Sequence, residues 1–405
     1  MSDVSIGRHR GKAARRHPVL RGFGYTILTL TLAIGLFSVY TYRHLNENLT
    51  NVDLREQLGD DRPAGTPKGD GQPINVLVMG SDTRDGEGND AVGGAQNVGQ
   101  RSDTTILMHV SGDRSFAYGV SIPRDAMVER PTCYDEDLNE IPGGFGMWNK
   151  AFDLGGPACT IRQVEQLTGI RVDHWVVVDF NGFKGMVDAL DGVEVCIPED
   201  VNDTVGNIYL EAGTRTVSGD EALDYVRVRH GIGLRENGDI GRMKRQQAFV
   251  ASMANKVMSK GMLAHPKQLL DFLDAATKSL TLDHELDSII KIADLGAQFQ
   301  EIGLSEIQFI TVPWRTYQPD KNRVEWVPEE AEELWQLIRE DRPLSRRLSA
   351  EAITADTEPG TRPTEEESQA AGPDQPSAPE TSQQADDPES ILPDPNEKAR
   401  ESGLC

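Results

Sequence analysis

The segment INVLVMG, residues 74–80, decides the fold. Its apolar residues follow one another almost without interruption, whereas a strand with one wet face would alternate apolar and polar side chains. Such a run is typical of a strand that is buried on both faces. A sheet that contains this strand must be covered by helices on both sides, so the segment predicts a layered α/β/α domain.

Strand-like and helix-like segments alternate along the rest of the chain. Further strands are expected at 104–110, 115–122, 174–180, 192–198 and 306–313, and the connection SGDR joins the first two as in a hairpin. Helices are expected at 160–169, 181–192, 218–228, 241–261 and 329–339. The predicted fold is therefore a three-layer α/β/α sandwich around a central mixed β-sheet.

The N-terminus carries a candidate membrane helix. Residues 22–42, GFGYTILTLTLAIGLFSVYTY, are uncharged, and about 20 apolar residues span a bilayer core. The preceding residues 1–21 are basic, which predicts a cytoplasmic tail, a single-pass anchor in the cell membrane and an extracellular domain. The alternative is a cleaved signal peptide, although the span is long for one and no clear cleavage site follows.

Composition divides the remainder into three parts. Residues 43–73 are polar and contain Pro and Gly, so they are expected to form a linker. The structured domain is expected over 74–341, and the tail 342–405 is expected to be disordered because it has few large apolar residues.

The chain has a net charge of −24, with 41 Lys+Arg against 65 Asp+Glu. This balance argues against a general nucleic-acid binder.

The four cysteines suit an exported protein. Cys133 and Cys159 lie in stretches that contain Gly and Pro and are the expected disulfide pair, with four free thiols as the alternative. Cys196 lies in the apolar run VEVCIP, which is typical of a buried free thiol. Cys405 at the C-terminus is unassigned.

A basic segment, DYVRVRHGIGLRENGDIGRMKRQQ at 224–247, stands out from the acidic chain. Arg227 and Arg229 would point to different faces of a helix, so they can meet on one ligand only if the backbone leaves the helix there. Arg242 and Gln246 share a face near the start of the next helix, where free N–H groups favour anions. Guanidinium groups donate in pairs and match phosphate oxygens. A solvated charged face is the alternative.

Two aspartates and an arginine mark the ends of neighbouring strands. Asp82 follows the strand 74–80, Asp103 precedes the strand 104–110, and Arg124 follows Pro123 at the end of the next strand. Mg²⁺ is typically held by one or two carboxylates together with substrate phosphates, and Mn²⁺ can take the same place. Asp82 and Asp103 are therefore candidate metal ligands, with two loop aspartates and no metal as the alternative.

Seven motifs resemble the LytR-CpsA-Psr family of actinobacterial type. They follow one another within residues 74–260 as NVLVMGSDTR, RSDTTILMHV, VSIPRD, NKAFDLGG, DHWVVVDFNGFKGMVDALDGVEV, SGDEALDYVRVRH and GDIGRMKRQQAF. The glycine-rich insert at 86–100 departs from the family pattern and would form a lid over the site.

The resemblance implies an enzyme that transfers a glycopolymer phosphate. The donor would be a polyprenyl-pyrophosphate-linked glycan, the acceptor peptidoglycan, and the released product polyprenyl phosphate. By motif position Asp82 and Asp103 would hold Mg²⁺, and Asp239 would support Arg242. The residues expected at the pyrophosphate are Arg124, Arg227, Arg229, Arg242 and Gln246, of which Arg124, Arg227 and Arg229 would act in catalysis with the two metal-binding aspartates. An apolar tunnel for the lipid would be lined by Val176, Val178, Phe180, Phe183 and Leu190, which ordinary core packing explains equally well.

Two other functions stay open at this stage. The protein could bind or hydrolyse polyprenyl pyrophosphate without transferring the glycan. It could also be an envelope-related transcriptional regulator, which the membrane helix opposes because the basic segment would face away from DNA.

Overall fold

A computed structural model gives the structure of the protein. It describes residues 18–65, 71–81, 102–229, 238–259, 262, 265–350 and 352–356. The chain divides into two units, an N-terminal part that ends at Glu47 and a body that begins at Asn48.

The N-terminal unit contains helix α1 (Pro18–Glu47). Its stretch Phe23–Glu47 is long and apolar enough to cross a membrane. Large apolar side chains along it are exposed, including Phe23 and Leu36, which are 67% and 70% exposed. A helix with this surface is stable in a bilayer and unfavourable in water. The helix therefore suggests a single-pass membrane anchor, and it extends a few residues beyond each end of the predicted span.

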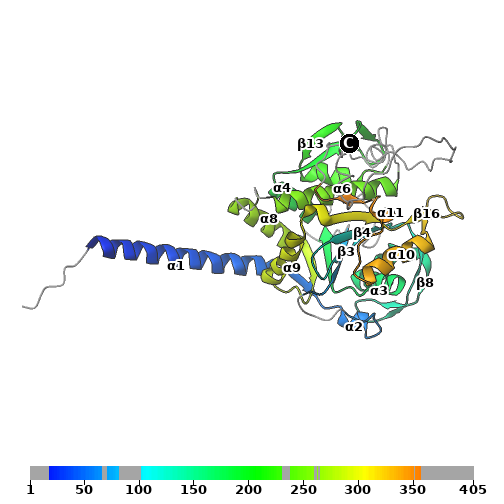
Figure 1. The fold of residues 1–405 in the computed structure, drawn as a ribbon, viewed down its shortest axis with the longest axis horizontal. Helices are drawn as coiled ribbons and strands as arrows, with labels where there is room; N and C mark the ends of the chain where they lie inside the picture. Colours follow the sequence, from blue (N-terminus) through cyan, green and yellow to red (C-terminus); the bar gives the residue numbers. More distant parts are fainter. Residues whose placement is uncertain are drawn as a thin grey trace, which may run out of the picture. The chain divides into compact units, whose positions relative to one another are not determined.

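An eight-stranded mixed sheet forms the centre of the body (Figure 1). The strands lie side by side in the order β1 (Thr50–Val52), β14 (Leu280–Asp283), β9 (His174–Asp179), β2 (Ile74–Ser81), β3 (Ser102–Val110), β4 (Ala117–Ile122), β15 (Ile307–Thr311) and β18 (Ile353–Thr354). The β2–β9 and β4–β15 pairs are parallel, and the β2–β3 and β3–β4 pairs are antiparallel. The strand predicted at 74–80 is β2, and it lies inside the sheet with a neighbour on each side.

Helices cover both faces of this sheet, which confirms the predicted three-layer sandwich (Figure 1). On one face Leu77, Met79 and Leu107 pack against buried residues of α3 and α10. On the other face Ala117 and Phe309 pack against α6 and α9. Among the described residues, the helices of the body are α2 (Arg55–Leu58), α3 (Lys150–Thr168), α4 (Phe180–Ala189), α5 (Gly219–Arg227), α6 (Asp239–Met258), α8 (Pro266–Ser279), α9 (Ile289–Ile302), the 3-10 helix η2 (Leu304–Glu306), α10 (Pro328–Arg339) and α11 (Arg346–Ser349).

Short antiparallel pairs lie outside the main sheet. They are β5 (Met127–Arg130) with β8 (Gly144–Met147), β6 (Cys133–Tyr134) with β7 (Glu140–Ile141), β10 (Val193–Ile197) with β13 (Gly213–Val217), β11 (Val201–Asp203) with β12 (Ile208–Leu210), and β16 (Trp314–Thr316) with β17 (Val324–Trp326).

The body is longer at both ends than the 74–341 domain predicted from composition. Within the expected linker 43–73, β1 pairs with β14 at the sheet edge, and Leu58 of α2 is buried in the core. Arg62 Nη2 lies 2.6 Å from Oε1 of the buried Glu165. In the expected tail, β18 pairs with β15, so the body continues to residue 356. These segments are short and have few apolar residues, so their sequences show no hydrophobic periodicity from which a strand or helix could be predicted.

Helix α3 begins ten residues before the predicted helix and is kinked. Gly155 and Gly156 have non-helical backbone angles, with φ +58° at Gly156. A Cβ on Gly155 would overlap with Cys159 Sγ, so the close approach of the chain to the disulfide requires glycine there.

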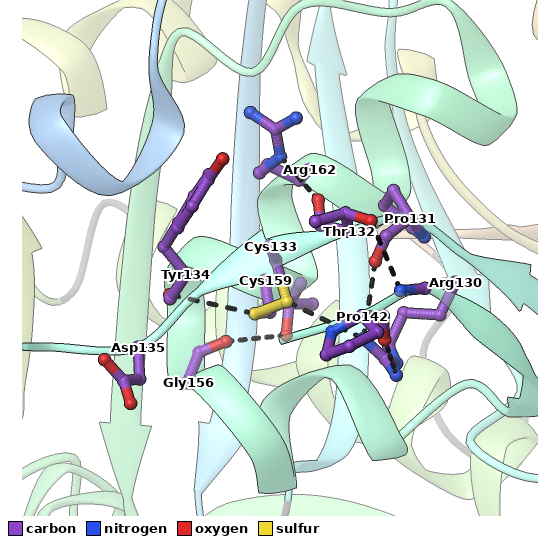
Figure 2. Close-up of a disulfide and its surroundings, with 12 residues drawn as sticks. Arg130, Pro131, Thr132, Cys133, Tyr134, Asp135, Pro142, Gly156, Cys159 and Arg162 are labelled. Atoms are coloured by element: carbon purple, nitrogen blue, oxygen red, sulfur yellow. Dashed lines mark hydrogen bonds between the residues drawn. A yellow bond between two sulfur atoms is a disulfide. The ribbon is translucent and has the colours of Figure 1, made fainter. Parts of the chain in front are cut away.

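The Cys133–Cys159 disulfide is confirmed (Figure 2). It joins the β6–β7 hairpin to α3, and Arg162 of that helix donates to the Thr132 carbonyl at 3.1 Å. The prediction of a free thiol at Cys196 was wrong, because Cys196 is buried and disulfide-bonded. Its bonding partner lies outside the described residues.

Removing the Cys133–Cys159 bond is expected to destabilise the body. The bond closes a loop with a sequence separation of 26 residues, so the loop-entropy model gives about 3.5 kcal/mol. Chemical denaturation of a Cys133→Ala/Cys159→Ala double variant under oxidising conditions measures this loss. An unchanged free energy of unfolding would show that the hairpin is held by its packing alone.

Candidate functional site

Three arginines from separate segments converge on the carboxylate of Asp103. Arg124 Nη1 lies 2.7 Å from Asp103 Oδ1, and Arg229 Nη2 lies 3.0 Å from Asp103 Oδ2. Arg242 Nη1 lies 3.7 Å from the same Oδ2. Asp103 is in β3, Arg124 follows β4, Arg229 follows α5, and Arg242 is in the first turn of α6. The structure therefore brings together four of the residues predicted from the sequence.

Asp239 supplies the second carboxylate. Its Oδ1 lies 2.6 Å from Arg242 Nη2 and 2.9 Å from Arg124 Nε. Arg242 also donates to the main-chain carbonyl of Asp103 at 3.0 Å, and its side chain is 1% exposed. The sequence-based expectation that Asp239 supports Arg242 is thus met in the geometry. We call Asp103, Arg124, Arg229, Asp239 and Arg242 the arginine cluster.

Strand register explains why Asp103 meets Arg124. In the antiparallel β3–β4 pair, Thr105 lies opposite Ile122, so the start of β3 and the end of β4 are neighbours. Pro123 follows directly and has no N–H to extend the ladder. The chain therefore turns away and carries Arg124 over the start of β3.

The end of α5 delivers Arg229. The helix ends at Arg227, and Val228 has extended backbone angles of φ −57° and ψ 132°. The helix break that was the condition for Arg227 and Arg229 to meet is present, but of the two only Arg229 contacts Asp103. Arg245 and Gln246 of α6 then hold the segment, because their side chains donate to the carbonyls of Val228 and Val226.

Arg227 and Gln246, which were predicted to bind the same anion, lie outside the arginine cluster. The Arg227 guanidinium lies 4.9 Å from the ring centroid of Phe180. Gln246 is buried, and its Nε2 donates to the Val226 carbonyl at 3.1 Å, so it positions the backbone beside the cluster. Asp82 and the insert 86–100 lie outside the described residues.

The cluster shifts the pKa values of its own groups. Burial alone would raise the pKa of Asp103, but the charges of Arg242, Arg124 and Arg229 outweigh it and hold the pKa below its ordinary value. Burial and the neighbouring Arg242 charge lower the pKa of Arg229 to about 10. Asp103 is therefore ionised, and Arg229 is the arginine whose charge is least compensated.

Several buried donors of the cluster have no hydrogen-bond partner within the described part of the chain. They include Nε of Arg229 and Nε of Arg242. Buried N–H groups are normally paired, and an unpaired one is costly. Three guanidinium groups also share only two carboxylates, so the cluster itself has net positive charge. Unused donors and excess positive charge are the properties of an anion-binding site.

Two neighbours of the cluster were not assigned a role from the sequence. Asp125 Oδ1 lies 3.6 Å from Arg124 Nε and 3.4 Å from Arg323 Nη1. Burial raises the pKa of Asp125, and the charge of Asp239 adds to the rise. Arg323 precedes β17 and is about 200 positions away along the chain. The sequence could have indicated Asp125 as a site residue, because it directly follows Arg124. Arg323 lies in no recognisable motif.

Asp103 is the candidate metal ligand that the structure describes. Both of its oxygens face guanidinium groups, and no group of three metal-ligand side chains occurs among the described residues. Mg²⁺ needs only one or two carboxylates when phosphate oxygens complete its shell. The described residues alone therefore do not form a metal site, and a cation at Asp103 would need phosphate oxygens to complete its shell.

Two known proteins are similar to this chain over a large part of its length. Cell wall biosynthesis protein LcpA of Corynebacterium glutamicum is 30% identical over 327 residues, which cover 73% of this chain and 60% of that protein. The chain thus spans less than two thirds of the length of that relative. The polyisoprenyl-teichoic acid–peptidoglycan teichoic acid transferase TagT of Bacillus subtilis is 29% identical over 271 residues, which cover 64% of this chain and 76% of that protein.

A solved structure shares the fold. The LytR-Csp2A-Psr enzyme from Actinomyces oris superposes with a TM-score of 0.53 at 21% identity, covering 72% of this chain and 95% of that one. The model of the LytR_cpsA_psr family matches residues 39–338, which contain every described residue of the arginine cluster. The chain belongs to the LytR_cpsA_psr family.

Proposed function

We propose that this protein transfers a glycopolymer phosphate from a polyprenyl-pyrophosphate carrier to peptidoglycan and releases polyprenyl phosphate. The observation that carries the proposal is the convergence of Arg124, Arg229 and Arg242 on Asp103 with unused buried donors. The printed names of LcpA and TagT, which concern cell wall biosynthesis and transfer of teichoic acid to peptidoglycan, support the same reaction class.

The reaction is a phosphoryl transfer. The oxygen of a peptidoglycan sugar hydroxyl attacks the phosphorus that carries the glycan, and the bond from this phosphorus to the bridging oxygen breaks. Polyprenyl phosphate leaves with the bonding electron pair. The arginines bind the pyrophosphate oxygens and neutralise the charge that builds on them, which is the main source of catalysis in such transfers.

Asp125 is the candidate acceptor of the hydroxyl proton. A base must be free to accept a proton, and Asp103 is poorly suited because three arginines lower its pKa. The pKa of Asp125 is raised, so its carboxylate holds a proton more readily. It lies beside Arg124 and so beside the proposed phosphate site.

The lipid chain is proposed to lie next to Arg227. Phe180, under the Arg227 guanidinium, and Phe183 are partly buried against the cluster of apolar residues that contains Leu190. A half-buried apolar surface beside a cation suits a polyprenyl phosphate. The α1 helix would anchor the protein with its N-terminus in the cytoplasm and the body outside the cell membrane.

Mg²⁺ is proposed to bind Asp103 and Asp82 together with the pyrophosphate, where it would neutralise phosphate charge. Because the cluster alone is positively charged, Mn²⁺ used as a probe is expected to bind the protein much better when inorganic pyrophosphate is present. Electron paramagnetic resonance measures this binding. Asp103→Asn is expected to weaken it by at least about tenfold, and the exposed Asp287→Asn is the control. The assignment would be contradicted if Mn²⁺ binding were the same with and without pyrophosphate and were unchanged by Asp103→Asn.

Two substitutions separate phosphate binding from proton transfer. Arg229→Gln removes a guanidinium and is expected to lower transfer by about 10²-fold. Asp125→Asn keeps the shape and is expected to lower kcat while the KM for the donor stays unchanged. The assay incubates the full-length protein in detergent with radiolabelled polyprenyl-pyrophosphoryl-N-acetylglucosamine and peptidoglycan, and follows label on the peptidoglycan.

Arg215→Gln is the matched control, because the Arg215 side chain is 32% exposed against 29% for Arg229 and pairs with Glu221. Label released only as free sugar phosphate would show hydrolysis in place of transfer. Full transfer by Arg229→Gln would rule out the arginine cluster as the phosphate site.

A further inference from the structure

A cavity of about 420 Å³ lies between two hairpins next to the arginine cluster. One hairpin is β5–β8 and the other is β16–β17. The Val324 N–H donates to the Asp125 carbonyl at 3.3 Å, and Ala126 forms a parallel bridge with Val324. Segments about 200 positions apart therefore form the two sides of one site.

Two aromatic side chains line this cavity. Phe145 in β8 is 54% exposed, and its ring centroid lies 6.1 Å from that of Tyr317, which follows β16. An exposed phenylalanine is unfavourable in water, and aromatic residues are enriched at binding surfaces. Their flat faces suit the apolar C–H faces of sugar rings.

One of the three cations that line the cavity has no carboxylate partner among the described residues. Arg130, Lys150 and Arg323 line the cavity together with Asp320. Lys150 Nζ lies 3.0 Å from Asp153 Oδ2, and Arg323 is paired with Asp125 and Asp320. Arg130 donates to the Pro142 carbonyl at 2.7 Å (Figure 2), and no described carboxylate forms an ion pair with it. Arg130 is therefore the lining cation that is available to a carboxylate of a ligand.

One carboxylate separates the cavity from the arginine cluster. Asp125 Oδ1 lies 3.4 Å from Arg323, which lines the cavity, and 3.6 Å from Arg124, which belongs to the cluster. The hydroxyl group of the ligand that lies nearest to Asp125 would therefore be close to a phosphate bound at the cluster.

We propose that this cavity binds the glycan strand of the peptidoglycan acceptor. Its sugars would pack on Phe145 and Tyr317, and a muramyl or peptide carboxylate would face Arg130. The volume lies in the range of sites that hold a few sugar-sized groups. The assignment rests on the proposed function, because it supplies the acceptor for that transfer.

Binding and kinetics of the full-length protein in detergent test the proposal. The probes are a peptidoglycan tetrasaccharide that carries muramyl carboxylates and chitotetraose, which has none. Phe145→Ala is expected to weaken binding of both probes by about tenfold or more, since aromatic packing serves both. Arg130→Gln is expected to weaken only the tetrasaccharide, by about threefold, because a partly exposed charge contributes little.

The transfer assay then separates acceptor from donor. Phe145→Ala is expected to raise the KM for peptidoglycan and to leave the KM for the polyprenyl-pyrophosphate donor unchanged. Tyr209→Ala is the matched control, because Tyr209 is 63% exposed and does not line the cavity.

Three results would overturn the proposal. Unchanged tetrasaccharide binding in Phe145→Ala would exclude the cavity. A raised donor KM with an unchanged acceptor KM would assign the cavity to the donor glycan. Equal affinity of the wild-type protein for both probes would exclude carboxylate recognition. Failure of the wild-type protein to transfer would overturn the proposed function, and titration of the two probes would still decide whether the cavity binds the glycan.

Discussion

The sharing of two carboxylates among three guanidinium groups is the interaction on which the site depends. Arg242 is almost completely buried, and a buried charge is tolerated only when it is paired and hydrogen-bonded. Asp103 and Asp239 supply that pairing and hold the arginines in place before any anion arrives. Because the positive charges outnumber the negative ones within the cluster, one positive charge is left that an anion would neutralise.

The fold supplies this arrangement through regular elements. The register of β3 and β4 places Asp103 beside Arg124, and the first turn of α6 supplies Asp239 and Arg242. Side chains on such elements are held more accurately than side chains on long loops. The chain continues from the end of β4 through Asp125 to β5, so the arginine cluster and the cavity share one structural support.

Much of this was predictable from the sequence because it is written in short patterns. The apolar run 74–80 predicted the sandwich, and the arginine spacing at 227 and 229 predicted the helix break. The sequence could not show that Arg227 lies over Phe180 and that Gln246 bonds a carbonyl, because both contacts depend on how helices pack. Arg323 and the Phe145–Tyr317 pair were missed because both contacts are tertiary and join residues that are far apart along the chain.

Whether the arginine cluster binds a pyrophosphate group can be tested with two lipids that differ only in their headgroup. The affinity of the purified full-length protein for polyprenyl pyrophosphate and for polyprenol can be measured in the same detergent. If the arginine cluster binds the pyrophosphate, the first lipid binds at least about a hundredfold more tightly, since two charge-assisted hydrogen bonds suffice for that ratio. Equal affinities would show that the protein recognises the lipid chain alone and would contradict the account.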